Sequence, residues 1–517
     1  MSDAAVVLVV LGVAVVAFVS NKVPVGVVAV VTTLTLLATG VIDAPTALGG
    51  FGDPVVVFIA TLFVVAEGLE SSGVTAWAGR TLTARVGNRR GPLTGAVAGL
   101  SGVISALITP NGAAATMLPV VTTAARRADV SPSRLLIPTA FGASAGALLT
   151  LAGSPVNVLV HEASVEAGGG GFGFFEFAGA GVPLLVGTVV VVAVLGHVLP
   201  DRGPGPLVGD IADHVDTLVE HYDLEHSSRA ALVDQEVGLV EVVVPPRSGA
   251  LGRTVFPGMQ VAADVTVLGV VRLGRDLGAR HVQLAQGDAL LLRGTWSSVE
   301  TLGEEFLVVG APEQLRRQLS ARRPAVTAVV VLVAMVVALA SGITVPAVAG
   351  LAAAVAMVAL GVVRPSRVYR AISWQTLVLI GALIPLSVAV RDSGAADLVA
   401  SRLMDVVGDN RLLALAAVFV LTAALGQVVS NAATVLVVIP VALAVAADAG
   451  IGTQTMLMTV AVAGAASLLT PIATPANMIV MTPGGYRFGD YWRLGAVTML
   501  VYLVVALAVV PALWGLG

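Results

Sequence analysis

The sequence predicts an all-α polytopic membrane protein of two inverted repeats, each with five spans and a re-entrant hairpin, plus a small cytosolic α+β insert. Three observations predict this fold. Hydrophobic residues make up 57% of the 517 residues and charged residues only 12%, whereas charged residues approach a quarter of a soluble globular chain. Apolar runs of about 20 residues, the length that crosses a bilayer, recur along the chain. These runs form two series whose landmarks repeat at a nearly constant spacing.

The first membrane repeat is expected within residues 1–200. Apolar runs that can span lie at residues 4–20, 23–40, 54–70, 134–160 and 178–199. The first run lacks a basic flank and leads directly into the second, so we interpret it as a retained span rather than a cleaved signal. Residues 74–86 carry Arg80 and Arg85 and predict an interfacial helix. Residues 92–127 break at Thr-Pro-Asn-Gly, 109–112, into limbs too short to span, which favours a re-entrant hairpin.

Residues 201–323 differ in composition from the apolar runs on either side. An acidic linker is expected at 201–235, a domain of short alternating strands at 236–310, and a second linker at 311–323. Three histidines, His214, His221 and His226, lie among acidic residues in the first linker. Imidazole and carboxylate groups are metal ligands, so a metal site is one interpretation. A solvated acidic helix is the favoured alternative.

The second membrane repeat is expected within residues 324–517. Its apolar runs lie at residues 325–340, 344–363, 374–391 and 494–514, with an amphipathic stretch at 395–407 and breaks at Ser430-Asn431 and 469–477. Landmarks recur between the halves: Ser72 and Pro119 match Ser393 and Pro440, 321 positions later, and Asn157 matches Asn477, 320 positions later. Because each half holds an odd number of crossings, the second half is expected to be inverted relative to the first.

Arginine placement predicts the orientation in the cell membrane. With both termini outside, Lys22, the arginine-bearing loops and both ends of the insert lie in the cytoplasm; those loops are residues 80–90, 126–134, 364–370 and 487–493. The opposite loops at 41–53 and 161–176 carry acidic residues and no Lys or Arg, and the exceptions are Arg391, Arg402 and Arg411. This bias follows the positive-inside rule and predicts a multi-pass plasma-membrane protein with a cytoplasmic insert.

Four breaks in apolar runs form two pairs, residues 109–112 with 153–157 and residues 429–434 with 473–477. Irregular backbone at membrane depth is tolerated only where it is buried in protein or lines a cavity. Helix N-termini at such breaks attract anions. Unwound carbonyls and the side chains of Asn111, Asn157, Asn431 and Asn477 can coordinate Na⁺. For any single break, packing and helix kinking by small polar residues and proline remain the alternative.

Two stretches resemble the divalent anion:sodium symporter family, solute carrier family thirteen, of the ion transporter superfamily. They are residues 426–440, GQVVSNAATVLVVIP, and residues 468–495, LLTPIATPANMIVMTPGGYRFGDYWRLG, with GGYRFGD the most specific part. The resemblance extends over both membrane halves. In that family two Ser-Asn-Thr hairpin tips bind carboxylates or sulfate, and sodium lies between each tip and the facing unwound helix.

The resemblance implies two overlapping sets of ligands. The implied substrate-binding residues are Asn111, Gly112, Ser154, Ser430, Asn431, Thr434 and Thr474. The implied sodium ligands are Ser105, Asn111, Gly153, Asn157, Ser430, Asn431, Ala473 and Asn477. Na⁺ would be the coupling ion, and no other cofactor is expected.

The two hairpin tips of this chain depart from the family pattern. The first reads Thr-Pro-Asn and the second Ser-Asn-Ala, which implies fewer hydroxyl donors for a carboxylate. The stretch TPNGAA is also similar to the Asn-Asp-Gly-Ala-Ala tip of arsenite permeases, a more distant branch.

Residues 236–310 resemble the RCK C-terminal (TrkA-C-like) domain, a small module that dimerises and regulates channels and permeases. The resemblance implies a homodimer and an unknown regulatory ligand, and a structural insert without a ligand is the alternative. Few ionisable side chains lie within the spans: Glu67, Glu70, His161 and His197 lie near span ends. We interpret these four as interfacial, which favours sodium over proton coupling.

Together these features predict sodium-coupled uptake of a small anion, sulfate or a di- or tricarboxylate, by alternating access. Two alternatives stay open: an efflux permease or cation–proton antiporter for arsenite or sodium, and RCK-regulated potassium transport, although no TVGYG-like filter is present. No nucleophile, metal cluster or phosphate loop indicates an enzyme, no basic patch indicates nucleic-acid binding, and the lack of cysteine excludes disulfides. The expected partners are the lipid bilayer, the transported anion and a second copy of the chain.

Overall fold

The computed structural model describes residues 2–20, 22–75, 77–78, 81, 90–202, 237–245, 248–262, 264–272, 275–277, 281–295, 298, 306–309 and 322–517. The chain divides into two compact units. The membrane unit is made of Met1–Ser71, Trp77–Leu207 and Val326–Gly517, and the insert unit of Ser72–Ala76 and Val208–Ala325. The predicted interfacial helix around Arg80 and Arg85, the histidine cluster at 214–226 and most of both predicted linkers lie outside the described residues.

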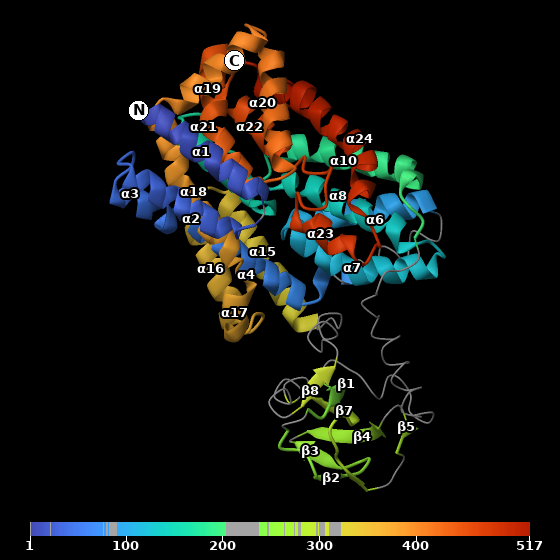
Figure 1. Ribbon diagram of the computed structural model, residues 1–517. Coiled ribbons are helices and arrows are strands. Elements are labelled where there is room, and N and C mark those ends of the chain that lie inside the picture. The colour runs from blue at the N-terminus through green and yellow to red at the C-terminus, as the bar shows by residue number, and fades with distance from the viewer. Residues whose placement is uncertain are drawn as a thin grey trace. The chain divides into compact units, whose positions relative to one another are not determined.

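The first series of helices runs from Asp3 to Val198 (Figure 1). Its elements are α1 Asp3–Ser20, α2 Val25–Ala38, α3 Ala44–Gly49, η1 Gly50–Gly52, α4 Pro54–Ser71, α6 Arg90–Ser105, α7 Pro110–Arg127, η2 Pro132–Arg134, α8 Leu136–Gly146, η3 Ala147–Leu149, η4 Leu151–Gly153, α9 Pro155–Glu166, α10 Ala178–Leu195 and η5 Gly196–Val198. Proline stands at the first position of α4, α7 and α9, where the missing N–H costs no hydrogen bond. The helices therefore restart at the breaks that the sequence predicts at Pro110 and Pro155.

The second series runs from Arg322 to Trp514. Its elements are α15 Arg322–Ala340, α16 Pro346–Ala359, α17 Pro365–Ala371, α18 Trp374–Asp392, α19 Ala395–Val407, α20 Arg411–Gly426, α21 Asn431–Ala449, α22 Thr453–Gly464, α23 Pro475–Met481, η7 Phe488–Asp490, α24 Tyr491–Val504, the π-helical turn η8 Val505–Val509 and α25 Val510–Trp514. No helix is assigned to residues 465–474, so this stretch interrupts the chain between α22 and α23. The predicted break at 469–477 is confirmed, with its last three residues forming the start of α23.

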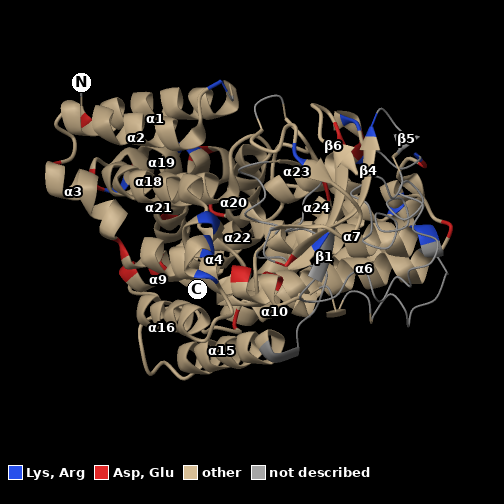
Figure 2. Ribbon diagram, turned by 90° about the horizontal axis from the view of Figure 1, so that it is seen from below, with Lys and Arg blue, Asp and Glu red and all other residues tan. Residues whose placement is uncertain are grey.

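Six helical segments among the described residues are long and apolar enough to cross a membrane. They are Asp3–Ser20, Ala44–Ser71, Ala178–Val198, Trp374–Asp392, Asn431–Ala449 and Phe488–Trp514, and five shorter apolar helices accompany them. Charged residues are sparse on these helices (Figure 2), and residues 324–363, which include most of α15 and all of α16, contain none. The helical, multi-pass class predicted from composition is thereby confirmed.

Close backbone contacts at glycine hold the helices of the membrane unit together. A Cβ atom at Gly142 of α8 would lie 2.1 Å from Ala98 O of α6, and one at Gly146 would lie 2.1 Å from Gly102 O. Only residues without a side chain permit this approach. Helices α6, α7, α8 and α23 pack together on one side of the unit, while α2 packs on α18 and α4 on α16 (Figure 1).

The insert unit contains a small antiparallel sheet. Its strands are β1 Val237–Val243, β2 Thr254–Val255, β3 Gln260–Ala262, β4 Val265–Arg272, β5 Arg275–Asp276, β6 Val282–Gln283, β7 Ala289–Thr295 and β8 Leu307–Val309. The main sheet has the order β3-β4-β7-β1-β8 with β5 on β4, and β2 pairs with β6. Alternate residues such as Val240 and Val242 of β1, or Val265 and Val267 of β4, are buried, as expected when one face of a strand packs on a core. The short strands predicted within residues 236–310 are confirmed, and β1, β4 and β7 are the longest of them.

Candidate functional site

All four predicted breaks contribute residues to one central cavity of about 480 Å³ in the membrane unit. The break between α6 and α7 contributes Thr109–Gly112, the break before α9 contributes Ser154–Asn157, the break before α21 contributes Ser430–Ala432, and the break before α23 contributes Ala473–Pro475. Helices α4, α8, α17, α18 and α22 and the α17–α18 turn supply most of the remaining wall. A cavity of this volume lies in the range of small-molecule sites.

Asn157 organises the first broken helix. Thr150 and Ser154 have extended backbone, with φ of −142° and −151°, so the carbonyls of this segment lack helical partners. The Asn157 side-chain Nδ2 donates to Ala147 O and to Thr150 O, both at 2.8 Å. Because both partners are acceptors, the amide nitrogen must face them. Asn157 Oδ1 is left buried without a hydrogen-bond partner.

Asn477 repeats this arrangement in the second broken helix. Its Nδ2 donates to Ser467 O at 3.2 Å and to Thr470 O at 3.0 Å, and its Oδ1 is likewise buried without a partner. Asn477, Ser467 and Thr470 each lie 320 positions after Asn157, Ala147 and Thr150. The same local fold therefore presents one free amide oxygen in each half of the chain.

The two hairpin tips differ in how they cap the N-terminus of the helix that follows. Thr109 precedes α7, and its Oγ1 accepts a hydrogen bond from Gly112 N at 3.3 Å. Ser430 precedes α21 but makes no capping bond, and its Oγ is buried without a partner. A side-chain cap satisfies first-turn N–H groups that would otherwise be free. The N-terminus of α21 is thus the open one.

Each tip is tied directly to the broken helix beside it. In the second half Ser467 Oγ donates to Asn431 Oδ1 at 2.8 Å, and Gln427 Oε1 accepts from Leu469 N at 2.9 Å. Thr470 Oγ1 donates to Gln427 O at 2.9 Å. In the first half Thr150 Oγ1 donates to Ala106 O at 2.5 Å. These bonds join each tip to its broken helix.

The charged residues that line the cavity, among those described, are Glu67 and Glu70 of α4. Glu67 is 9% exposed, and its Oε1 lies 3.9 Å from Arg367 Nη1. Glu70 lies beside the α7 tip: a Cβ atom built on Gly112 would stand 2.4 Å from Glu70 Oε1. The cavity wall therefore combines two carboxylates with helix ends and neutral oxygen atoms.

The structure brings eight of the implied ligands to the cavity wall. These are Asn111, Gly112, Ser154, Asn157, Ser430, Asn431, Ala473 and Thr474. Ser105, Gly153, Thr434 and Asn477 are not part of the wall, although Ser105 Oγ, Thr434 Oγ1 and Asn477 Oδ1 are buried without partners. Gly153 serves the turn itself, because a Cβ atom there would lie 2.3 Å from Ala147 O.

Sequence reasoning assigned no binding role to four residues that shape the site: Glu67, Glu70, Thr109 and Gln427. We expected Glu67 and Glu70 to be interfacial, whereas both line the cavity. Thr109 stands 321 positions before Ser430, so the spacing of the repeat could have identified Thr109 as the residue of the first tip that corresponds to Ser430. Gln427 is an isolated amide at the end of an apolar helix, and this position could have indicated a polar role for its side chain.

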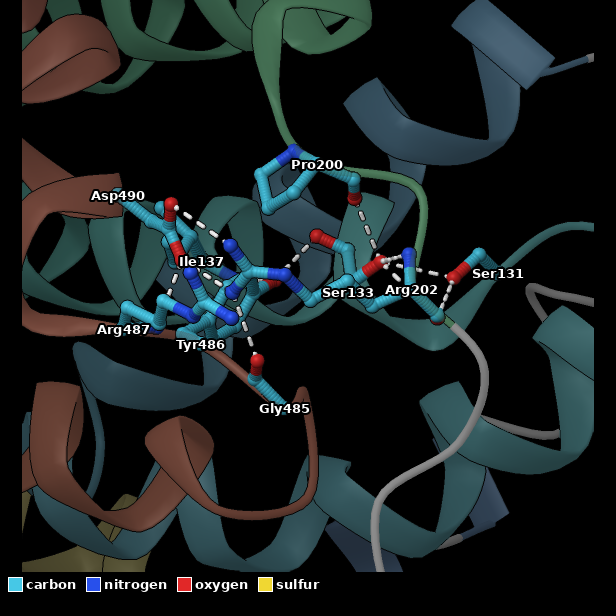
Figure 3. A network of polar contacts seen from close by, with 9 residues as sticks. All are labelled: Ser131, Ser133, Ile137, Pro200, Arg202, Gly485, Tyr486, Arg487 and Asp490. Atoms are coloured by element: carbon cyan, nitrogen blue, oxygen red, sulfur yellow. Dashed lines mark hydrogen bonds and ion pairs between the residues drawn. The ribbon is translucent and has the colours of Figure 1, made fainter.

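The GGYRFGD block, residues 484–490, fixes the chain that follows α23 (Figure 3). Tyr486 OH donates to Ser133 O and accepts a bond from Ile137 N at 3.1 Å. Arg202 Nη1 donates to Asp490 Oδ2 at 2.5 Å and to Gly485 O at 2.8 Å. Next to the block, Tyr491 OH donates to Asn477 O at 2.7 Å. The block thus anchors the broken helix that carries Asn477 to the loop before α8.

Comparisons with known proteins agree with this architecture. Over 98% of both chains the sequence is 26% identical to the "Uncharacterized transporter YfbS" of Escherichia coli (strain K12). It is 24% identical to the "Putative sulfur deprivation response regulator" of Chlamydomonas reinhardtii, over 92% of this chain and 95% of that protein. The crystal structure of the Alcanivorax borkumensis YdaH transporter has a similar fold, with a TM-score of 0.51 and 14% identity over 96% of this chain and 98% of that chain.

A family model establishes the relationship. The CitMHS model, described as "Citrate transporter", matches residues 15–463 and 386–516, which together cover nearly the whole chain. Neither this family nor the similar YdaH fold is that of an enzyme. The chain is a multi-pass membrane transporter and belongs to the CitMHS family.

Proposed function

We propose that the protein takes up a small anion, sulfate or a di- or tricarboxylate, together with sodium by alternating access. One observation carries the proposal: the open N-terminus of α21 lines a cavity beside buried oxygen atoms that have no hydrogen-bond partner. The open helix N-terminus suits an anion, and the buried oxygen atoms suit a hard cation. A transporter that moves both through one cavity needs both features.

The anion would bind at the N-terminus of α21. Free first-turn N–H groups and the helix dipole favour negative charge at such an end. Ser430 leaves these groups uncapped and offers its own hydroxyl as a further donor. Since no Lys, Arg or His is among the described residues of the wall, the helix end supplies the main attraction for an anion.

Sodium would bind at the free oxygen atoms of the broken helices. Asn157 Oδ1 and Asn477 Oδ1 are buried without partners, as are Ser105 Oγ, Ser430 Oγ and Thr434 Oγ1. A buried acceptor without a partner costs about 1–3 kcal/mol, and a bound cation removes that cost. The charge of the cation also offsets the charge of the anion and of Glu67 and Glu70. Neutral oxygens of this kind hold coupling ions at broken helices.

The printed descriptions of two matches support the choice of anions to test. The CitMHS model is described as a citrate transporter, and the Chlamydomonas relative is named for sulfur deprivation. Citrate and sulfate are therefore the first anions to test, with succinate as a smaller carboxylate. A cavity of about 480 Å³ is within the usual range for a ligand the size of citrate.

Alternating access would occur between the two halves of the chain, which we propose are inverted repeats. The resemblance to the divalent anion:sodium symporters implies the same arrangement. The equivalent amide networks of Asn157 and Asn477 support this assignment. We further propose both termini outside, the insert in the cytoplasm, and an RCK-like insert that binds a regulatory ligand and helps form a homodimer. Cysteine labelling from each side of the membrane tests the orientation.

The test is uptake by proteoliposomes that hold the purified protein. Radiolabelled citrate or sulfate should accumulate with an inward sodium gradient and not with potassium in its place. Asn431→Ala and Asn477→Ala should abolish this uptake. Asn410→Ala is the matched control, because Asn410 caps α20 and is not part of the cavity wall. If uptake does not depend on sodium and both variants remain active, the proposal is disproved.

A second candidate is export or cation–proton antiport, in which the cargo is arsenite or sodium. The observation that favours it is the pair of carboxylates, Glu67 and Glu70, on the cavity wall, because membrane-embedded carboxylates carry protons in antiporters. Everted vesicles separate the two functions. Proton-driven accumulation of arsenite or sodium in such vesicles, with no sodium-dependent citrate or sulfate uptake in proteoliposomes, would establish the second candidate.

A further inference from the structure

Each half of the membrane unit has a buried serine hydroxyl where the helix before the hairpin tip meets the broken helix. In the second half it belongs to Ser467, in the stretch between α22 and α23, and in the first half to Ser105, the last residue of α6. Both side chains are fully buried. Ser105 and Ser467 are not equivalent positions of the repeat, so the two halves supply this hydroxyl from opposite sides of the contact.

Gly426, the last residue of α20, makes room for the hydroxyl of Ser467. A Cβ atom at Gly426 would stand 2.9 Å from Ser467 Oγ, too close for a side chain unless the serine moves. The counterpart of Gly426, 321 positions earlier, is Ser105, and the counterpart of Ser467, 320 positions earlier, is Ala147. The serine and the small residue have therefore exchanged places across the contact.

Neighbouring hydrogen bonds show that the two contacts are built alike. Thr470 Oγ1 donates to Gln427 O at 2.9 Å, and Thr150 Oγ1 donates to Ala106 O at 2.5 Å. Gln427 and Ala106 directly follow Gly426 and Ser105, and the two threonines lie three positions after Ser467 and Ala147. Because the same bond joins the same repeat positions, residue 105 faces residue 147 as residue 426 faces residue 467.

Gln427 fixes the segment on both sides of Ser467. Its Nε2 donates to Ala466 O at 3.0 Å, and its Oε1 accepts from Leu469 N at 2.9 Å. Ala106, at the equivalent position of the first half, has no side chain that could make such bonds. The second half thus holds the irregular segment that carries its serine, whereas the serine of the first half stands on a helix that its own hydrogen bonds fix.

The hydroxyl of Ser467 keeps its lone pairs for a cation. Its oxygen lies 2.8 Å from Asn431 Oδ1 and 3.4 Å from Gly464 O. Both are acceptors, so the hydroxyl donates its one proton and retains the two lone pairs of a serine oxygen. Beside it, Asn477 Nδ2 donates to Ser467 O at 3.2 Å, and Asn477 Oδ1 is buried without a partner. Ser105 Oγ is also buried without a partner. Oxygen atoms of this kind at a broken helix suit Na⁺.

We propose that Ser467 is a sodium ligand of the second half and that its hydroxyl takes the place of the one that Ser105 supplies in the first half. The inference rests on the proposed function, which puts sodium at these broken helices. The ligand has moved from the helix before the tip to the broken segment, and Gly426 leaves the space that the move requires. The two sodium sites therefore use the same kind of oxygen atom from different positions of the repeat.

The first test measures how sodium raises the Tm of the purified protein in detergent, with choline keeping the ionic strength constant. Ser467→Ala should increase the sodium concentration for the half-maximal effect by about tenfold, a change typical of losing one buried polar interaction. Sodium-dependent uptake should show the same shift. Ser401→Ala is the matched control, because Ser401 is an exposed residue of α19.

The second test exchanges the two sides of the contact. Gly426→Ser alone should weaken sodium binding, because the new side chain collides with Ser467 Oγ. Gly426→Ser with Ser467→Ala rebuilds the first-half arrangement and should recover most of the sodium affinity lost in Ser467→Ala. The reciprocal pair, Ser105→Gly with Ala147→Ser, should likewise recover the affinity lost in Ser105→Gly. A purely structural role for the serines predicts no recovery in either pair.

The inference is overturned if Ser467→Ala binds sodium as wild type does, or if neither exchange recovers sodium affinity. In both cases wild type still responds to sodium, so the proposed function stands. If wild type shows neither a sodium-induced rise in Tm nor sodium-dependent uptake, the proposed function fails and the inference fails with it.

Discussion

Arg202 binds both carboxylate oxygens of Asp490, with Nη1 2.5 Å from Oδ2 and Nη2 3.3 Å from Oδ1. The two residues are 288 positions apart and lie 30% and 17% exposed. Asp490 Oδ2 also accepts a bond from Arg487 N at 2.6 Å. The planar guanidinium matches a carboxylate in this way, which the ammonium group of lysine cannot do. The pair joins the chain that follows α10 to the loop that follows α23.

We predict that Arg202→Ala lowers the stability of the membrane unit by about 1–3 kcal/mol, the usual cost of losing hydrogen bonds to a charged group. Thermal unfolding of the purified protein in detergent measures the effect as a fall in Tm. Arg202→Lys should recover only part of it, because lysine cannot bind both oxygens. Asp490→Ala added to Arg202→Ala should cost less than the sum of the single changes, and fully additive effects would contradict a direct interaction.

Tyr491 connects the same loop to the candidate sodium ligand. Its hydroxyl donates to Asn477 O at 2.7 Å, and Tyr491 is buried. Tyr491→Phe should cost about 1 kcal/mol and raise the sodium concentration needed for half-maximal uptake, because the backbone beside Asn477 loses its anchor. Tyr369→Phe is the control, since Tyr369 is 71% exposed. Unchanged sodium dependence in Tyr491→Phe would show that the anchor has no effect on ion binding.

The two broken helices predict two sodium sites rather than one. Asn157 and Asn477 hold equivalent carbonyl pairs and leave equivalent oxygens free. Asn157→Ala should therefore raise the half-saturating sodium concentration by about tenfold or more, as should Asn477→Ala, and each should lower the Hill coefficient for sodium toward one. Flux measurements over a range of sodium concentrations report both quantities. Normal sodium dependence in Asn157→Ala would leave the second half as the only ion site.

Much of this site could be predicted from the sequence because its signals are local. A proline close to an asparagine inside an apolar run indicates that a helix is interrupted there, because proline lacks an N–H and asparagine can satisfy the carbonyls of irregular backbone. That reasoning located the breaks at Pro110, Pro155 and Pro475, and the cavity joins these breaks with the Ser430 tip. The strands of the insert were predictable for the same reason, since alternation of apolar residues is a local pattern.

Other parts of the site depend on packing between distant segments. Glu70 lies at the end of a span in the sequence, and only the approach of α4 to the α7 tip makes it a cavity residue. The difference between Thr109 and Ser430 also could not be predicted from residue type. Both are good capping residues, but only Thr109 makes a capping bond. The pairing of Arg202 with Asp490 carried no signal, because the two residues lie 288 positions apart.

Asp288 of the insert predicts a defined pH dependence. Its side chain is fully buried, yet it binds Arg272 Nε at 2.6 Å, Arg272 Nη2 at 2.7 Å and Ala285 N at 2.7 Å. Burial alone would raise the pKa of this carboxyl, but the hydrogen bonds from Arg272 and Ala285 outweigh it and hold the pKa below its usual value. A carboxyl with a lowered folded-state pKa stabilises the fold above its unfolded pKa of about 3.9.

This contribution is therefore complete at neutral pH and is lost as the pH falls below about 4, through the lowered folded-state pKa. Asp288→Asn should remove it at all pH values, because the amide cannot accept both Arg272 bonds as a charged group does. Hydrogen exchange of the full chain, corrected for intrinsic rates, should then show faster exchange in β4 and β7 at neutral pH, with no change in α21. Asp264→Asn is the control, because Asp264 lies in an exposed turn of the same sheet. Equal protection of β4 and β7 in Asp288→Asn and wild type would exclude a stabilising role for the Arg272–Asp288 pair.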